Sequence, residues 1–171
     1  HPKWRDNTLV VLTSDNGGTP ATRKTNGVLR GFKKDVFEGG IRNPLILRWP
    51  ARIKPGQSDT VMTVMDLPPT FLALSGVEGL NDRDGQSFAR QLIDGMPTPT
   101  NRTLFWMHKV KGDVKNRRKF KPAFAQHSWA VRDGSWKLVY EPLDAEKPML
   151  FDLSADAGEK IDLADKMPVR V

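Results

Sequence analysis

A carboxylate and an amide follow directly after a short apolar run near the start of the chain, in the order Asp15-Asn16-Gly17-Gly18. The apolar run over residues 9–12 fits a buried strand. In open α/β sheets, ligands bind just outside the carboxyl ends of the strands, so side chains at this position suggest a site. Both side chains offer oxygen, the ligand type that hard divalent cations prefer. The alternative is a tight turn at Asn16-Gly17, and these residues by themselves favour that turn.

Two lysines, Lys33 and Lys34, stand between glycine-containing bends at Gly31 and Gly39-Gly40. A lysine ammonium is a compact cation that suits an anionic group. A lysine in such a loop is, on the other hand, usually a solvated surface residue. The pair therefore offers a candidate anion contact, with ordinary surface exposure as the alternative.

The elements that must position these residues follow an α/β pattern in the first part of the chain. A second apolar run over 44–50 is predicted to form another buried strand. Residues 63–76 are predicted to form a helix with Asp66 as its N-cap and two prolines in its first turn. A short helix is expected over 89–93, and residues 96–100 have the composition of a linker.

The second part of the chain has the pattern of an antiparallel sheet. Strands are predicted over residues 102–108, 128–132, 136–140 and 149–153. Asp133-Gly134 lies between two of these runs and is a strong hairpin signal. We therefore expect an α/β body over residues 1–96 and, over residues 97–171, a small subdomain of about four antiparallel strands.

The composition is that of an ordinary soluble protein, with 38% hydrophobic and 27% charged residues over 171 positions. No apolar run approaches the ~20 residues that a membrane-spanning helix needs. The absence of cysteine excludes disulfides and thiolate metal sites in this sequence. The net charge of +7 is concentrated in residues 109–121, which contain seven basic residues and one acidic residue. This basic run could bind a polyanion, but a charged insertion between two strands is the favoured interpretation.

Three segments in order resemble the type I sulfatase family of the alkaline phosphatase superfamily. They are Thr13-Ser-Asp-Asn-Gly17, Leu29-Arg-Gly-Phe-Lys33 and Phe37-Glu-Gly-Gly-Ile-Arg-Asn-Pro44. Further segments continue the resemblance to about Leu163. The resemblance implies the C-terminal part of an alkaline-phosphatase-like sulfatase sandwich followed by a small antiparallel-sheet subdomain. It also implies hydrolysis of sulfate esters, in which a formylglycine attacks sulfur and a divalent metal stabilises charge.

The same resemblance assigns roles to individual residues. Asp15 and Asn16 would coordinate the metal, with Ca²⁺ expected and Mg²⁺ possible. Lys33 would be catalytic and would hold the sulfate group, with Lys34 as the alternative. His108 ends a Phe-Trp-x-His segment typical of many sulfatases, and it would either contact substrate or serve as a hydrogen-bonded structural histidine.

The resemblance also implies partners that lie outside this sequence. The formylglycine of the family forms from Cys or Ser in a Cys/Ser-x-Pro-x-Arg segment, and no such segment occurs here. We therefore expect this chain to be the C-terminal portion of a longer enzyme and to be inactive without its N-terminal part. The expected substrate is a sulfated small molecule or polysaccharide, with no nucleic acid, in a periplasmic, secreted or lysosomal protein. The alternatives are a phosphoester hydrolase of the same superfamily and a non-enzymatic polyanion-binding module.

Overall fold

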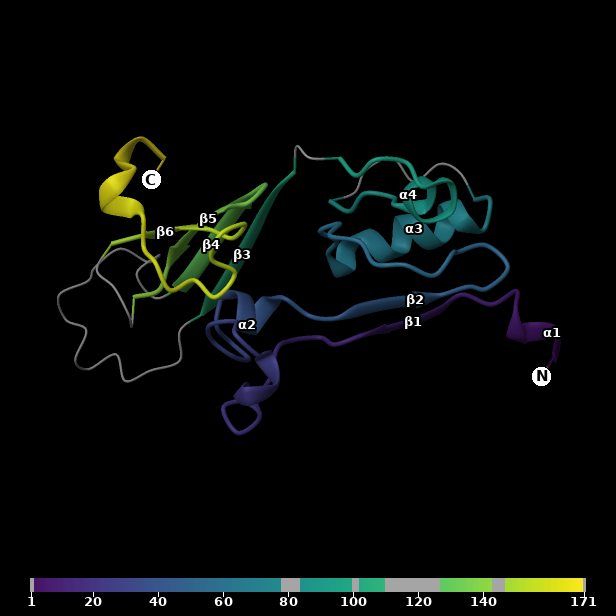
Figure 1. Ribbon diagram of the computed structural model, residues 1–171, viewed down its shortest axis with the longest axis horizontal. Coiled ribbons are helices and arrows are strands. Elements are labelled where there is room, and N and C mark those ends of the chain that lie inside the picture. Colours follow the sequence, from purple (N-terminus) through teal and green to yellow (C-terminus); the bar gives the residue numbers. More distant parts are fainter. Residues whose placement is uncertain (1, 78–83, 100–101, 110–126, 143–146, 171) are drawn as a thin grey trace. The chain divides into compact units, whose positions relative to one another are not determined.

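The computed structural model describes residues 2–77, 84–99, 102–109, 127–142 and 147–170 (Figure 1). These residues group into two units, His1–Leu12 with Ile46–Thr100 and Thr13–Leu45 with Asn101–Val171. The candidate site residues Asp15, Asn16, Lys33 and His108 therefore all belong to the second unit. A division of the protein at residues 96 and 97 stays a prediction.

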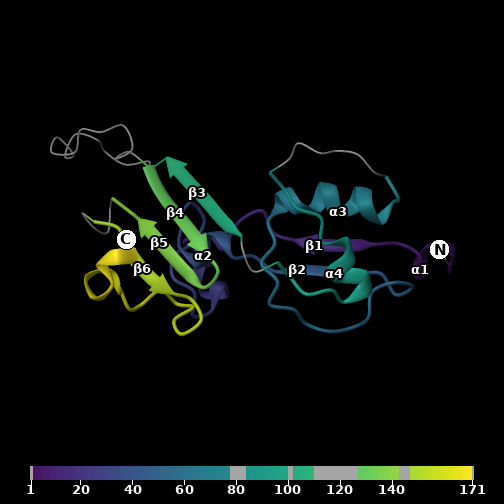
Figure 2. The same cartoon turned by 90° about the horizontal axis from the view of Figure 1, so that it is seen from above.

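The first unit contains short strands and helices joined by long connections. Its elements are α1 (Pro2–Arg5), most of β1 (Val10–Thr13) and β2 (Leu45–Arg48), the 3-10 turn η2 (Val64–Asp66), α3 (Leu67–Leu74) and α4 (Ala89–Asp94). β1 and β2 lie side by side in a two-stranded sheet (Figures 1 and 2). None of the helices in the described ranges is long and apolar enough to cross a membrane.

The two strands of this sheet carry exposed apolar side chains. Val10, Leu12 and Ile46 are 49%, 61% and 56% exposed. The prediction that residues 9–12 and 44–50 form strands is therefore confirmed, whereas the prediction that these strands are buried is wrong. Each strand has a single neighbour among the described residues, and an apolar strand is buried only where other elements cover both of its faces.

The start of α3 depends on Asp66, which occupies the predicted N-cap position. Its carboxylate accepts the backbone N–H groups of Thr63 and Gln86, at 2.6 and 2.9 Å. Its backbone oxygen accepts the hydroxyl of Thr70, which in turn accepts the N–H of Phe88 at 3.0 Å. Asp66 thus fixes the chain before α3 and ties the segment that precedes α4 to this helix.

The second unit contains a four-stranded antiparallel sheet in the order β3-β4-β5-β6. Its strands are β3 (Thr103–Lys109), β4 (His127–Asp133), β5 (Trp136–Tyr140) and β6 (Met149–Asp152). The predicted hairpin is confirmed, because β4 and β5 pair next to Gly134, which has φ +59°. The predicted antiparallel sheet is confirmed as well. The basic run over 109–121 lies, apart from Lys109, outside the described residues.

The core of the second unit lies between one face of this sheet and the segment that leads into α2 (Glu38–Ile41) (Figure 2). The buried apolar residues of this cluster are Val36, Phe37, Ala130, Val139, Met149, Phe151 and Leu153. Phe37 meets Phe151 edge to face, with ring centroids 6.4 Å apart. Trp106 packs against the cluster from β3, as expected for a tryptophan at a strand position.

Candidate functional site

Three backbone segments of the second unit interlock around the candidate site residues. The N–H of Gly17 donates to the oxygen of Gly40 in α2 at 3.0 Å, and the N–H of Gly39 donates to the oxygen of Arg30 at 2.6 Å. The N–H of Lys33 donates to the oxygen of Gly18 at 2.7 Å. These bonds bring the loop that carries Asp15 and Asn16 next to the loop that carries Lys33.

The glycines of these segments are required because the backbones approach so closely. A Cβ atom placed on Gly17 would lie 1.7 Å from the backbone oxygen of Gly39. A Cβ on Gly39 would lie 2.4 Å from the oxygen of Gly31, and one on Gly40 would lie 2.2 Å from the oxygen of Asp35. No side chain fits between these segments, so the glycines that the sequence marks as bends serve here as contact points between loops.

Asn26 joins the same three segments through its side-chain amide. The residue lies in the 3-10 turn η1 (Arg23–Asn26), inside the polar loop that follows Gly18. Its oxygen accepts the N–H of Gly18 at 2.9 Å, and its nitrogen donates to the backbone oxygens of Gly31 and Gly39, at 3.0 and 2.9 Å. The sequence analysis missed Asn26, because a single asparagine in a polar loop carries no local signal of these partners.

Asp15 and Asn16 present oxygen atoms at the end of β1. Asp15 is exposed and Asn16 is half-buried. The amide nitrogen of Asn16 donates to Oδ1 of Asp15, and the hydroxyl of Ser14 donates to the backbone oxygen of Asn16 at 2.8 Å. This leaves Asp15 Oδ2 and Asn16 Oδ1 as neighbouring oxygen donors. Their chemistry fits a hard divalent cation, which takes six to eight oxygen ligands in the case of Ca²⁺.

The described residues supply only part of such a metal site. No group of three or more His, Cys, Asp or Glu side chains in the described ranges could hold a metal ion. Further ligands would have to come from elsewhere in the protein or from water. Asp15 and Asn16 as metal ligands therefore remain a prediction that the local chemistry supports.

The two lysines of the anion candidate differ in their backbone. Both side chains are exposed, but Lys33 is fixed by its bond to Gly18 whereas Lys34 has φ +85°. The turn is closed on both sides by Asp35, whose carboxylate accepts the N–H of Phe32 and whose own N–H donates to the oxygen of Phe32, both at 2.9 Å. A left-handed conformation is unfavourable for lysine and costs about 1–2 kcal/mol. Of the two, Lys33 is the one whose backbone is bonded to the loop that carries Asp15 and Asn16.

His108 lies on β3 and has no hydrogen bond to these loops among the described residues. It is half-buried on β3, on the sheet face that also carries Leu104 and Trp106, and its register partner is Ser128. Ser128 donates to the buried carboxylate of Glu141 at 2.5 Å. No hydrogen bond or ion pair among the described residues joins His108 to the loops of Asp15 or Lys33. Its role in substrate binding therefore stays a prediction.

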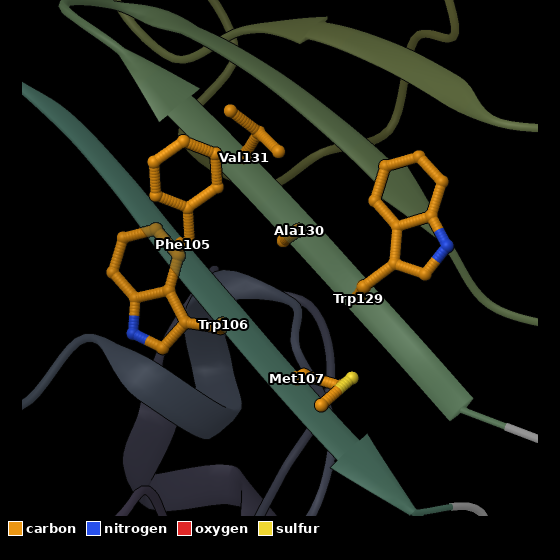
Figure 3. Close-up of a pocket in the computed structure, with 6 residues that line it drawn as sticks. All are labelled: Phe105, Trp106, Met107, Trp129, Ala130 and Val131. Carbon is orange, nitrogen blue, oxygen red and sulfur yellow. The ribbon is translucent and has the colours of Figure 1, made fainter. Parts of the chain in front are cut away.

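An apolar hollow lies along β3 and β4 (Figure 3). It is lined by residues of β3 and β4, namely Phe105, Trp106, Met107, Trp129, Ala130 and Val131. Phe105 and Met107 are 72% and 74% exposed, and Trp129 stacks on Tyr140 with ring centroids 5.6 Å apart. The hollow contains no ionisable side chain, so we do not assign the chemistry to it.

Comparison with known proteins points to one family. The family model described as Sulfatase matches residues 3–77. Arylsulfatase A of Bos taurus is 35% identical over 176 residues, which take in 94% of this chain and 34% of that protein. An N-acetylgalactosamine-6-O-sulfatase of Bacteroides thetaiotaomicron is 28% identical, over 95% of this chain and 34% of its own length.

A solved structure agrees with these matches. The crystal structure of Ps i-CgsB in complex with k-i-k-neocarrahexaose superposes with a TM-score of 0.81 at 25% identity, and the match covers 98% of this chain and 35% of that one. The chain thus spans about a third of the length of the relatives that it matches. The ordered segments, the α/β fold with its antiparallel sheet and these matches agree. Residues 3–77 of the chain match the sulfatase family model, and nearly the whole chain is similar to sulfatases.

Proposed function

We propose that the protein hydrolyses sulfate esters, with sulfated carbohydrates as the substrate class, and that the loops of Asp15, Asn16 and Lys33 form part of its active site. The observation that carries the proposal is the bond from the backbone N–H of Lys33 to the oxygen of Gly18, which joins the loop that carries Lys33 to the loop that carries Asp15 and Asn16. The sulfatase matches support the reaction, and the N-acetylgalactosamine-6-O-sulfatase relative supports the substrate class.

In this proposal each side chain has a defined task. Asp15 and Asn16 would hold Ca²⁺, or Mg²⁺, through their side-chain oxygens. The bound cation would stabilise the charge that develops on the sulfuryl oxygens. Lys33 would pair with the anionic sulfate group and orient it, because an ammonium ion acts as a compact positive charge. His108 would contact the remainder of the substrate.

The nucleophile would come from outside this sequence. None of the 171 residues forms a Cys/Ser-x-Pro-x-Arg segment, from which the formylglycine of the family arises. We propose that another part of the same protein supplies the formylglycine and that this chain without it does not turn over substrate. By family habit the protein would act in the periplasm, outside the cell or in the lysosome.

The matches do not favour the two alternatives, a phosphoester hydrolase and a non-enzymatic polyanion-binding module. The direct test is hydrolysis of 4-nitrophenyl sulfate, 4-nitrophenyl phosphate and N-acetylgalactosamine 6-sulfate by the full-length protein. We expect both sulfate esters to be preferred over the phosphate ester, with activity lost on chelation and restored by Ca²⁺.

Two matched variants test in this assay whether Asp15 binds the metal. Asp15→Ala should weaken Ca²⁺ binding and turnover, whereas Asp59→Ala, which removes an exposed carboxylate of the first unit, should leave both unchanged. A preference for the phosphate ester would contradict the proposed reaction. Unchanged Ca²⁺ affinity in Asp15→Ala would contradict the proposed metal site alone.

A further inference from the structure

Three fully buried ionisable side chains meet at the start of α2. Glu38, Lys137 and Glu159 are 1%, 0% and 0% exposed. The ammonium nitrogen of Lys137 donates to Oε1 of Glu38 at 2.9 Å and lies 2.8 Å from Oε1 of Glu159. Arg132 reaches the other oxygen of Glu38 at 3.8 Å, as does Arg42 at 3.9 Å. One buried lysine therefore serves two buried carboxylates, and two arginines extend the network.

This network also holds the backbone of the site loops. Oε2 of Glu159 accepts the N–H of Glu38 at 2.6 Å, in the first turn of α2. The backbone oxygen of Glu159 accepts a hydrogen bond from Arg30 at 3.2 Å, and the Arg30 guanidinium lies 3.9 Å from the centre of the Phe37 ring. Glu159 thus contacts Glu38, which begins α2, and Arg30, whose backbone oxygen accepts the N–H of Gly39.

Stability is a poor explanation for such an arrangement. Burying charged groups is costly, and replacing a buried ion network with apolar residues of similar volume is often neutral or stabilising. Burial raises the pKa of Glu159, and the neighbouring Lys137 opposes that rise only in part. Glu159 also has φ +52°, a conformation that is unfavourable for a residue with a side chain. What the network provides instead is one fixed position for the backbone around Glu38.

That position determines the geometry of the candidate site. Gly39 and Gly40 directly follow Glu38, and they accept the hydrogen bonds of Asn26 and of Gly17. The loop of Asp15 and Asn16 and the loop of Lys33 are therefore held by the same turn that Lys137 and Glu159 fix. A shift at Glu38 would be passed to both loops, because the close glycine contacts leave no space to absorb it.

We propose that Lys137 and Glu159 are positioning residues, which act through Glu38 to hold the loops of Asp15, Asn16 and Lys33 in place. The identity of what these loops bind rests on the proposed function, but the positioning itself does not. A merely structural role would loosen the whole unit when the network is removed. A positioning role would loosen the site loops more than the rest.

The test is hydrogen–deuterium exchange of the full-length protein, read from peptides that cover residues 15–20 and 30–36. The variant is Lys137→Met, and the matched control is Val139→Ala, which removes a fully buried side chain of the same strand without touching a charge. We expect exchange at the amides of Gly17 and Lys33 to be about tenfold faster in Lys137→Met than in the control. Equal exchange in these peptides would overturn the proposal.

A second variant keeps the test decisive if Lys137→Met does not fold. The double variant Lys137→Met with Glu159→Gln removes one cation and one anion together, so that no extra buried charge remains, and the same tenfold difference is expected. Ca²⁺ affinity measured on the same variants separates the two proposals. Faster loop exchange with unchanged Ca²⁺ affinity would support positioning and contradict the metal site. Unchanged exchange would contradict positioning whatever the Ca²⁺ affinity is.

Discussion

Asn26 offers a sharp test of the way the site loops are assembled, because its amide makes three hydrogen bonds to three different segments. Two of them are donated by its nitrogen, to the backbone oxygens of Gly31 and Gly39, and one is accepted from Gly18. At about 1 kcal/mol for each net bond, Asn26→Ala should lower the free energy of unfolding by about 3 kcal/mol. Asn26→Asp keeps the shape and the acceptor but turns an oxygen towards two carbonyl oxygens. It should therefore cost as much as the alanine variant, about 3 kcal/mol, despite its similar size.

Urea denaturation of both variants measures these losses. The matched control is Asn7→Asp, because the side-chain oxygen of Asn7 accepts the hydrogen bond of the Trp49 indole at 3.2 Å, and an aspartate oxygen can accept it as well. The control should stay within about 0.5 kcal/mol of the parent protein. The affinity for Ca²⁺ should fall in both Asn26 variants and should be unchanged in the control. If Asn26→Asp were as stable as the parent, the amide would not donate to the two carbonyls, and the assembly of the loops would have to be explained differently.

Two further predictions concern single residues with unusual environments. Lys34→Gly should raise the free energy of unfolding by about 1 kcal/mol, because Lys34 has φ +85° and glycine adopts this conformation without strain. Thermal or urea denaturation measures this change. A loss of stability would show that a contact of the lysine side chain stabilises the fold by more than the backbone strain costs. For Glu159, burial raises the pKa above its ordinary value of 4.5, and the like charge of Glu38 adds to this rise, although Lys137 beside it acts in the opposite direction. The folded protein then binds more protons than the unfolded protein between these two pKa values, so stability should fall as the pH rises through this window, and Glu159→Gln should flatten the decline. Two results would refute this reasoning: a parent protein whose stability rises with pH in this window, or a Glu159→Gln variant whose stability depends on pH as steeply as that of the parent.

The sequence predicts the second unit well where short-range patterns determine it. The short apolar and aromatic runs and the Asp133-Gly134 turn are local features, and they yield the four-stranded antiparallel sheet. The apolar runs around Val10 and Ile46 predict strands correctly but overstate their burial, because burial depends on what covers a strand and not on its own composition.

For the candidate site, the sequence could predict which residues take part but not the contacts that hold them in place. Carboxylate, amide and lysine could be selected from the sequence, because their chemistry and their glycine neighbours are local. The buried pair of Glu38 and Lys137 could not be, since its members are 99 positions apart and a charged residue is ordinarily expected at the surface. Glu159, 121 positions from Glu38, is hidden for the same reason.

The proposed active site requires that Lys33 contact the sulfate group of a substrate held beside Asp15 and Asn16. This contact is tested by kcat/KM of the full-length protein on 4-nitrophenyl sulfate, compared between Lys33→Ala and Lys34→Gly. We predict a loss of about 100-fold or more for Lys33→Ala, as expected when a group that stabilises the transition state is removed, and a change of less than about threefold for Lys34→Gly. Unchanged kinetics in Lys33→Ala would show that Lys33 does not contact the sulfate group, and a large loss in Lys34→Gly instead would assign that contact to Lys34.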